Sequence, residues 1–242
     1  MLFQPPSTRY DLNFSIFDIP VRVHPLFWLL GLLIGASSRS LTFMLVWVGA
    51  LFVSILIHEL GHSLMMRRFG IDSYIILHMM GGLAVPRGGR GGYNANEQIL
   101  ISLAGPVAGF ILAGLTIVVG VMMGGTFVIG SILFLPIPAV AFSGGGLVPT
   151  IVGAMLWINI FWGLVNLLPV YPLDGGQVAR AWFIKTDPWE GARKSLMLST
   201  AVGAIAAVGG LLLFSSPFML LLFGSLAAQS YQMMQGGGGP MY

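Results

Sequence analysis

The sequence predicts an all-α multi-pass membrane protein with about six transmembrane helices. Of its 242 residues, 56% are apolar and only 8% are charged, whereas an ordinary soluble domain carries about 25% charged residues. Apolar runs close to the roughly 20 residues that cross a bilayer recur between residues 26 and 234. This composition excludes a soluble globular protein and an intrinsically disordered chain.

Six apolar runs are the expected spans, of which the first is short. They cover residues 26–35, 41–65, 99–122, 150–168, 196–214 and 217–233. A further apolar stretch at 127–142 is interrupted by Pro136 and Pro138, so it is compatible with either a span or an interfacial hairpin.

The basic residues decide between these two alternatives. If 127–142 does not cross and the N-terminus is cytoplasmic, every lysine and arginine except Arg39 lies on the cytoplasmic side. If it does cross, the basic residues from Arg180 to Lys194 move to the face opposite Arg67, against the positive-inside rule. We therefore expect both termini in the cytoplasm, a cytoplasmic segment at 1–23 and a flexible Gly-rich tail at 235–242. No basic cluster indicates a nucleic-acid partner.

His58, Glu59 and His62 form the H-E-x-x-H pattern inside the second expected span. Residues four apart lie on one face of a helix, so both imidazoles can bind one metal ion, with Glu59 beside it to take a proton. Since the chain has no cysteine, nitrogen and oxygen ligands are the ones it offers to zinc. Ionisable side chains are costly inside a span, so three on one helical turn indicate function rather than polar core residues.

A catalytic zinc usually has three protein ligands and one water, so a third ligand is required. Asp174 is the candidate, because it follows the helix-breaking Pro169 and Pro172 and precedes Gly175 and Gly176, which permit a tight turn. The alternative is an ordinary surface turn. In the expected topology His58, His62 and Asp174 all lie at cytoplasmic ends of spans.

Two segments together resemble the site-2 protease family of intramembrane zinc metalloproteases. They are His58-Glu-Leu-Gly-His62 and Asn166-Leu-Leu-Pro-Val-Tyr-Pro-Leu-Asp174-Gly. Further likenesses are Val23-His24-Pro25, Gly81-Gly82 and Ser102-Leu-Ala-Gly105-Pro106. The resemblance extends over about residues 20 to 180. It implies an intramembrane metalloprotease domain at 24–234, with its core at about 41–180, and a short extended or re-entrant segment after the metal-binding helix.

The resemblance also implies the chemistry. His58, His62 and Asp174 would bind one zinc ion per chain, and Glu59 would be the catalytic acid/base. Zinc-activated water would hydrolyse peptide bonds within transmembrane segments of membrane-protein substrates, as in regulated intramembrane proteolysis. The expected surroundings are a lipid bilayer, most simply the plasma membrane.

Substrate contacts are implied for Asn166 and for Gly81 and Gly82. Asn166 would contact the substrate backbone or the oxyanion, and the two glycines would belong to an extended segment that pairs with substrate. The alternatives are an interhelical hydrogen bond for Asn166, which we favour for Asn159, and a simple turn at 81–82. For Gly105 and Gly109, a small-xxx-small pattern, we favour close helix packing.

Three other functions are alternatives to this one, and a feature of the sequence argues against each. Another membrane zinc metalloprotease would take a glutamate as third ligand, but neither Glu97 nor Glu190 lies in a matching pattern. A metal transporter would need a second polar cluster along its path. A non-catalytic binder of transmembrane segments would not need the intact Glu59. His24 and His78 are expected to be interfacial or hydrogen-bonded rather than ligands.

Overall fold

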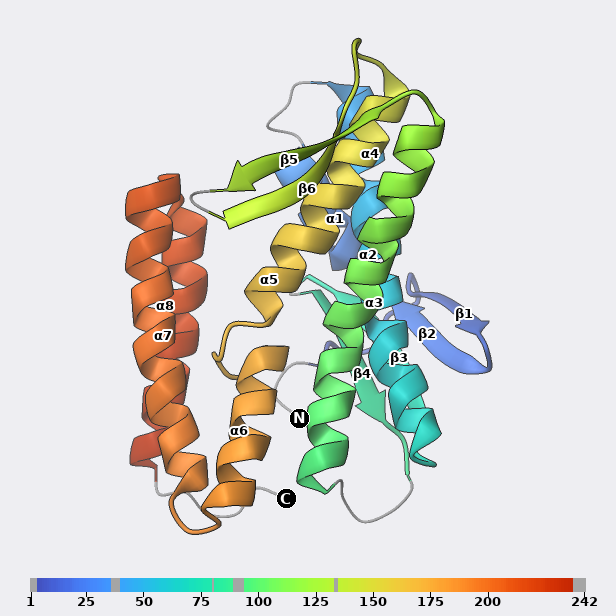
Figure 1. Ribbon diagram of the computed structural model, residues 1–242. Helices are drawn as coiled ribbons and strands as arrows, with labels where there is room; N and C mark the ends of the chain where they lie inside the picture. Colours follow the sequence, from blue (N-terminus) through green and yellow to red (C-terminus); the bar gives the residue numbers. More distant parts are fainter. Residues whose placement is uncertain (1–3, 36–39, 80, 89–93, 133–134, 237–242) are drawn as a thin grey trace. The chain divides into compact units, whose positions relative to one another are not determined.

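The computed structural model describes residues 4–35, 40–79, 81–88, 94–132 and 135–236 (Figure 1). Most of the tail expected at 235–242 lies outside these residues. The chain forms two compact units, one of residues 1–89 and 104–163 and the other of residues 90–103 and 164–242. Each unit is described by itself.

Four helical segments are long and apolar enough to cross a membrane. They are Leu41–Arg68 (α2), Ala95–Met122 (α3), Leu147–Asn166 and Gly191–Phe214 (α7). The third consists of α4 (Leu147–Trp157), a π-helical turn η2 (Ile158–Trp162) and α5 (Gly163–Asn166). On α3, the exposed Val107, Ile111 and Leu115 form a stripe with a spacing of four residues. Apolar side chains exposed along such a stripe suit a lipid environment, and the chain is an integral membrane protein.

The prediction of six spans is wrong. Helix α1 (Pro25–Gly35) has 11 residues and rises about 16 Å, roughly half the thickness of the hydrocarbon core. Helix α8 (Pro217–Gln235) has 19 residues, but Gln229, Gln232 and Gln235 fall within it and lower its mean hydropathy. Both segments are apolar, but α1 is shorter than a span and α8 is polar over its last turns, so neither is among the four candidate spans.

The prediction of an all-α fold is also wrong, because the described chain contains two β-sheets. The larger has the order β1 (Leu12–Ile16), β2 (Ile19–Val23), β3 (Ser73–His78) and β4 (Gly81–Pro86). Strands β1 and β2 are antiparallel, as are β3 and β4, whereas β2 and β3 are parallel, with Val21 opposite Ile75. The extended segment expected after the metal-binding helix occurs as strand β4.

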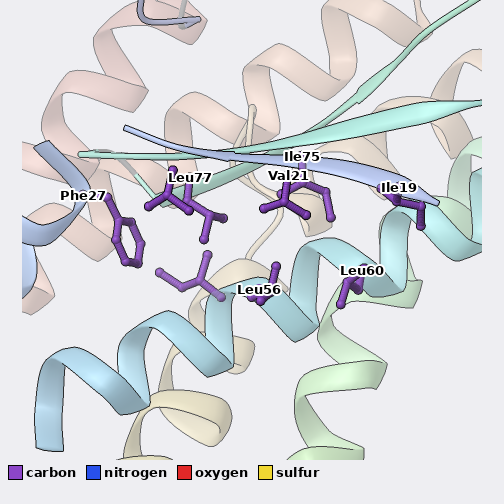
Figure 2. Close-up of a cluster of buried hydrophobic side chains, with 9 residues drawn as sticks. Ile19, Val21, Phe27, Leu56, Leu60, Ile75 and Leu77 are labelled. Atoms are coloured by element: carbon purple, nitrogen blue, oxygen red, sulfur yellow. The ribbon is translucent and has the colours of Figure 1, made fainter. Parts of the chain in front are cut away.

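The larger sheet packs against α2 and fixes how that helix is rotated (Figure 2). The buried cluster between them consists of Ile19, Val21, Val23, Phe27, Ile55, Leu56, Leu60, Ile75 and Leu77. Leu56 and Leu60, one turn apart, carry the helix side of this contact. Residues two positions further along a helix lie about 200° around its axis, so His58 and His62 do not lie on the face formed by Leu56 and Leu60.

The smaller sheet is a hairpin between α3 and α4. It pairs β5 (Thr126–Ile132) with β6 (Leu135–Ala141) in antiparallel fashion. Ile137 and Val140 of β6 pack against a cluster that includes Ala113 of α3 and Val152 of α4. The apolar stretch at 127–142 is therefore a strand hairpin rather than a helical span.

The second unit contains α6 (Asp174–Thr186) and the antiparallel helices α7 and α8. A Cβ atom on Gly203 would lie 3.1 Å from the Cβ atom of Ala227, so α7 and α8 pack closely through small residues. Because α8 runs back along α7, its C-terminal end returns to the side on which α7 begins.

Candidate metal centre

The H-E-x-x-H residues converge on one face of α2. The Nε2 atoms of His58 and His62 are 3.1 Å apart, and the potential ligand atoms of His58, Glu59 and His62 lie within 4.8 Å of one another. Two nitrogens bound at 2.0–2.1 Å to a tetrahedral ion are about 3.3–3.4 Å apart. Glu59 and His62 are buried. The donor set and spacing therefore fit a zinc ion.

Strand β4 approaches this cluster beside Glu59. A Cβ atom on Gly82 would lie 2.5 Å from Oε1 of Glu59, so a side chain at this position would displace the carboxylate of Glu59. The preceding Gly81 has φ of 120°, a conformation that favours glycine. Gly81 and Gly82 thus bring a sheet edge directly against the carboxylate of Glu59.

Helix α3 approaches the cluster beside the two histidines. A Cβ atom on Gly105 would lie 2.7 Å from Nε2 of His58 and would also meet the imidazole of His62. A glycine on α2 also permits this contact between the two helices, since a Cβ atom on Gly61 would lie 2.5 Å from the carbonyl oxygen of Ala104 in α3. The small-residue pattern at Gly105 predicted close packing, but did not reveal that imidazoles occupy the space.

Asn159 ties the π-helical turn to α2. It is buried, and its Nδ2 donates to Oγ of Ser54 and to the carbonyl oxygen of Met155, both at 2.8 Å. Ser54 lies one helical turn before His58. The interhelical hydrogen bond favoured for Asn159 is therefore confirmed, and π-helical turns are frequent near functional sites.

Asp174 lies in the second unit, as the first residue of α6, and is buried. A carboxylate is stabilised there by the helix dipole. The alternative of a surface turn is wrong, because Cβ atoms on Gly175 and Gly176 would lie 2.6 Å and 2.5 Å from the carbonyl oxygens of Leu168 and Val170. The glycines serve close packing of α6 on residues 167–171 rather than a tight turn.

The loop before Asp174 is held by hydrogen bonds within its unit. The N–H of Tyr171 donates to Oγ of Ser199 at 3.1 Å, and the N–H of Leu173 donates to the carbonyl oxygen of Val170 at 2.8 Å. The bond between Tyr171 and Pro172 is cis. These contacts give Asp174 a defined position in its own unit.

The structure thus brings together His58, Glu59, His62 and Gly82 in the first unit. Asn166, the last residue of α5, and Asp174 belong to the second unit. Their places relative to the histidines stay predictions.

His24 and His78 lie at the ends of β2 and β3, and both are buried. Nδ1 of His24 accepts from the N–H of Leu26 at 3.2 Å, so His24 is hydrogen-bonded, as expected. Burial lowers the pKa of His78, and the charges of His24 and Arg22 act in the same direction. Within the described residues, the metal-binding group of α2 includes neither histidine.

The chain is similar to a peptidase family and to proteins named zinc metalloproteases. The family model for Peptidase family M50 matches residues 46–210. "Zinc metalloprotease MJ0392" of Methanocaldococcus jannaschii is 28% identical over 222 residues, covering 88% of this chain and 53% of its own. "Putative zinc metalloprotease sll0528" of Synechocystis sp. is 30% identical over 207 residues, covering 78% of this chain and 48% of its own. The chain thus spans about half the length of these two relatives.

A solved structure is also similar to this chain. The "Site-2 Protease from Methanocaldococcus jannaschii" is 25% identical, with a TM-score of 0.56, and the match covers 96% of this chain and 99% of that one.

Proposed function

The chain belongs to Peptidase family M50, and we propose that it is an intramembrane zinc metalloprotease that hydrolyses peptide bonds within transmembrane segments of membrane proteins. Membership confirms the resemblance to site-2 proteases, the zinc metalloprotease class and the zinc cofactor. The observation that carries the proposal is the position of the His58, Glu59 and His62 cluster inside α2, an apolar helix of 28 residues.

Zinc would be held by His58 and His62, with Asp174 as the third protein ligand. When bound, zinc supplies Lewis acidity and lowers the pKa of a coordinated water toward about 7. Asp174 is suited to this task because it is buried at a helix N-terminus, on a loop held by backbone packing.

Glu59 would be the acid/base. Its carboxylate lies within 4.8 Å of the ligand atoms of both histidines and occupies the space that the missing side chain of Gly82 leaves. It accepts a proton from the attacking water and returns a proton to the leaving amine. Burial on a rigid helix holds the carboxylate in place for both transfers.

The edge of β4 would hold the substrate main chain. Pro86 lies opposite Ser73 and has no N–H, so these two residues do not form a hydrogen-bonded pair. Because the two kinds of pair alternate, Ala84 opposite Ile75 and Gly82 opposite Leu77 are also pairs without ladder hydrogen bonds. The N–H and C=O groups of Gly82 and Ala84 therefore point to the outer edge. An extended substrate would add there as a strand beside Glu59, and Asn166 would contact its backbone or the oxyanion.

Replacing Glu59 tests the proposed reaction. Glu59→Gln keeps the shape of the side chain but cannot move a proton, so cleavage of a model transmembrane substrate should fall about 10²- to 10⁴-fold. Zinc content should stay near one per chain. Glu190→Gln, at an exposed carboxylate, is the matched control and should cleave normally. Near-normal cleavage by Glu59→Gln would remove Glu59 from the mechanism, and zinc-free wild-type protein would contradict the site.

We also propose a plasma-membrane protein with both termini in the cytoplasm. The sheet register places residues 12–23 beside residues 73–86, so the chain returns to the start of α2 through a segment that includes α1, although α1 alone is shorter than a span. Helix α8 likewise runs back along α7, although it is not among the four candidate spans. The cysteine-free parent permits single-cysteine labelling. Ser143→Cys should label from outside, whereas Arg87→Cys and Lys194→Cys should label from the cytoplasm. Labelling of the last two from opposite sides would place Asp174 across the membrane from His58.

A further inference from the structure

Strand β5 has an open edge. Its partner residues in β6 include Pro138 opposite Ile129 and Pro136 opposite Ser131. Since proline has no N–H, these are pairs without ladder hydrogen bonds, and the N–H and C=O groups of Ile129 and Ser131 point away from β6. Within the described chain, no backbone hydrogen bond joins these groups to another segment.

The two edges of this hairpin differ. On β6, Pro136 and Pro138 remove the outward donors, and Ile137 packs against the helices. On β5, Phe127 is 50% exposed and Ile129 is 64% exposed. Proline is a usual means of blocking strand addition at a sheet edge. One edge of the hairpin is therefore blocked and the other is available.

Strand β5 lies in a long stretch of sequence without charged residues. Between Glu97 and Asp174 the sequence contains no Asp, Glu, Lys, Arg or His. Charged residues, which commonly protect exposed edges from pairing, are thus missing along the whole stretch. An apolar strand suits this edge, because a charged strand would lose hydration without gaining an ion-pair partner.

The edge is connected to the metal centre by a single helix. Gly105 of α3 lies against the histidines, and Met122 ends the helix shortly before β5. Met122 lies 17 positions after Gly105, which corresponds to about 26 Å along the axis of α3 at 1.5 Å per residue. A substrate segment covers that distance with about 17 residues as a helix or about 8 as a strand. One transmembrane segment of roughly 20 residues is therefore long enough to extend from the metal centre to the end of α3 that leads into β5.

We propose that the outer edge of β5 is a second substrate-binding site, at which an apolar stretch of the substrate adds as a third strand. The inference rests on the proposed proteolytic function and deepens it. Pairing at β5 holds the substrate extended at a set distance from Glu59, and so favours unwinding of the segment that must be cut. It also satisfies backbone groups that are costly to leave unpaired near lipid.

Removing the outward donors tests the site. Ile129→Pro and Ser131→Pro each delete one outward N–H, whereas Ile129→Val and Ser131→Ala keep it. We expect the double proline variant to cleave a transmembrane substrate about tenfold more slowly, through a raised KM with kcat retained. The double control should stay within about twofold. A proline variant that retains zinc and shows an unchanged KM overturns the proposal.

Cross-linking gives a readout that does not depend on cleavage. Ile129→Cys, combined with Glu59→Gln, is oxidised with substrates that carry single cysteines along their transmembrane segment. Strand pairing predicts disulfides at every second substrate position, centred about 8 to 17 residues from the scissile bond. Cross-links only between two enzyme chains would assign the edge to a second copy. Absence of cross-links, with capture of a photoactivatable lipid instead, would assign it to lipid, and either result overturns the proposal.

The two proposals fail separately. Loss of cleavage in Glu59→Gln without alternating cross-links or a proline effect refutes the β5 site alone. Alternating cross-links in a protein whose wild-type form cleaves nothing refute the proteolytic function while the β5 binding site stands.

Discussion

Helix α2 and the segment leading into α6 supply their metal-binding candidates in different ways. On α2, His58 and His62 meet because helix periodicity brings residues four apart together. On α6, Asp174 depends on a loop whose backbone packs against Gly175 and Gly176. The first arrangement is local and visible in spacing. The second is tertiary, so substitutions that leave every candidate ligand intact can still displace Asp174.

The largest expected effect tests whether both regions bind the metal. Asp174→Ala removes the proposed third ligand, so zinc affinity should fall by at least about a hundredfold, beyond the 10- to 100-fold cost of losing an outer-shell partner. Metal analysis after dialysis measures this loss. Asp187→Asn, at the far end of α6, is the control and should retain zinc. Unchanged stoichiometry in Asp174→Ala would assign the metal to α2 alone.

A smaller effect is expected from the helix that faces the histidines. Gly105→Ala places a methyl group against both imidazoles, so zinc affinity should fall about 10- to 100-fold while the ligands remain. Gly114→Ala, on the same helix with no atom within 4 Å of its Cβ position, should bind zinc normally. Equal affinities in the two variants would show that the imidazoles move aside freely.

The smallest effect is expected in the loop. Gly175→Ala forces the first turn of α6 away from residues 167–168, so zinc affinity should fall less than in Asp174→Ala, with a lower melting temperature. The matched variant is Gly209→Ala in α7, where the Cβ position is open. If Gly175→Ala melted and bound zinc like Gly209→Ala, Asp174 would not depend on this packing.

The predictable parts of the molecule are those set by local periodicity. The H-E-x-x-H spacing identified the cluster on α2, and charge excluded a helical span at 127–142. The four-stranded sheet was missed although Ile19, Val21 and Val23 alternate with Pro20 and Arg22, because the strand is short and its partner β3 lies about 50 residues away. Its effect on the rotation of α2 could not be derived from spacing.

The contacts of Gly82 and Gly105 were likewise beyond the sequence. Gly82 lies on β4 and Gly105 on α3, whereas the side chains they meet lie on α2. Whether a Cβ atom fits at either glycine therefore depends on how β4 and α3 pack against α2. The pattern around Gly105 indicated only that something approaches closely. Which group approaches is a tertiary property, and here it is an imidazole that would bind the metal.

The parallel pairing of β2 with β3 imposes an order on biosynthesis. Strand β2 is made early, but Val21 pairs with Ile75, and both α1 and α2 must be synthesised between them. At about 5–20 residues per second, β2 waits several seconds for its partner. Until then Leu56 and Leu60 lack the sheet on which they pack. The surroundings of His58, Glu59 and His62 on α2 therefore form only after the whole helix has been synthesised. Deleting β2 should impair folding of this region although no candidate ligand is removed.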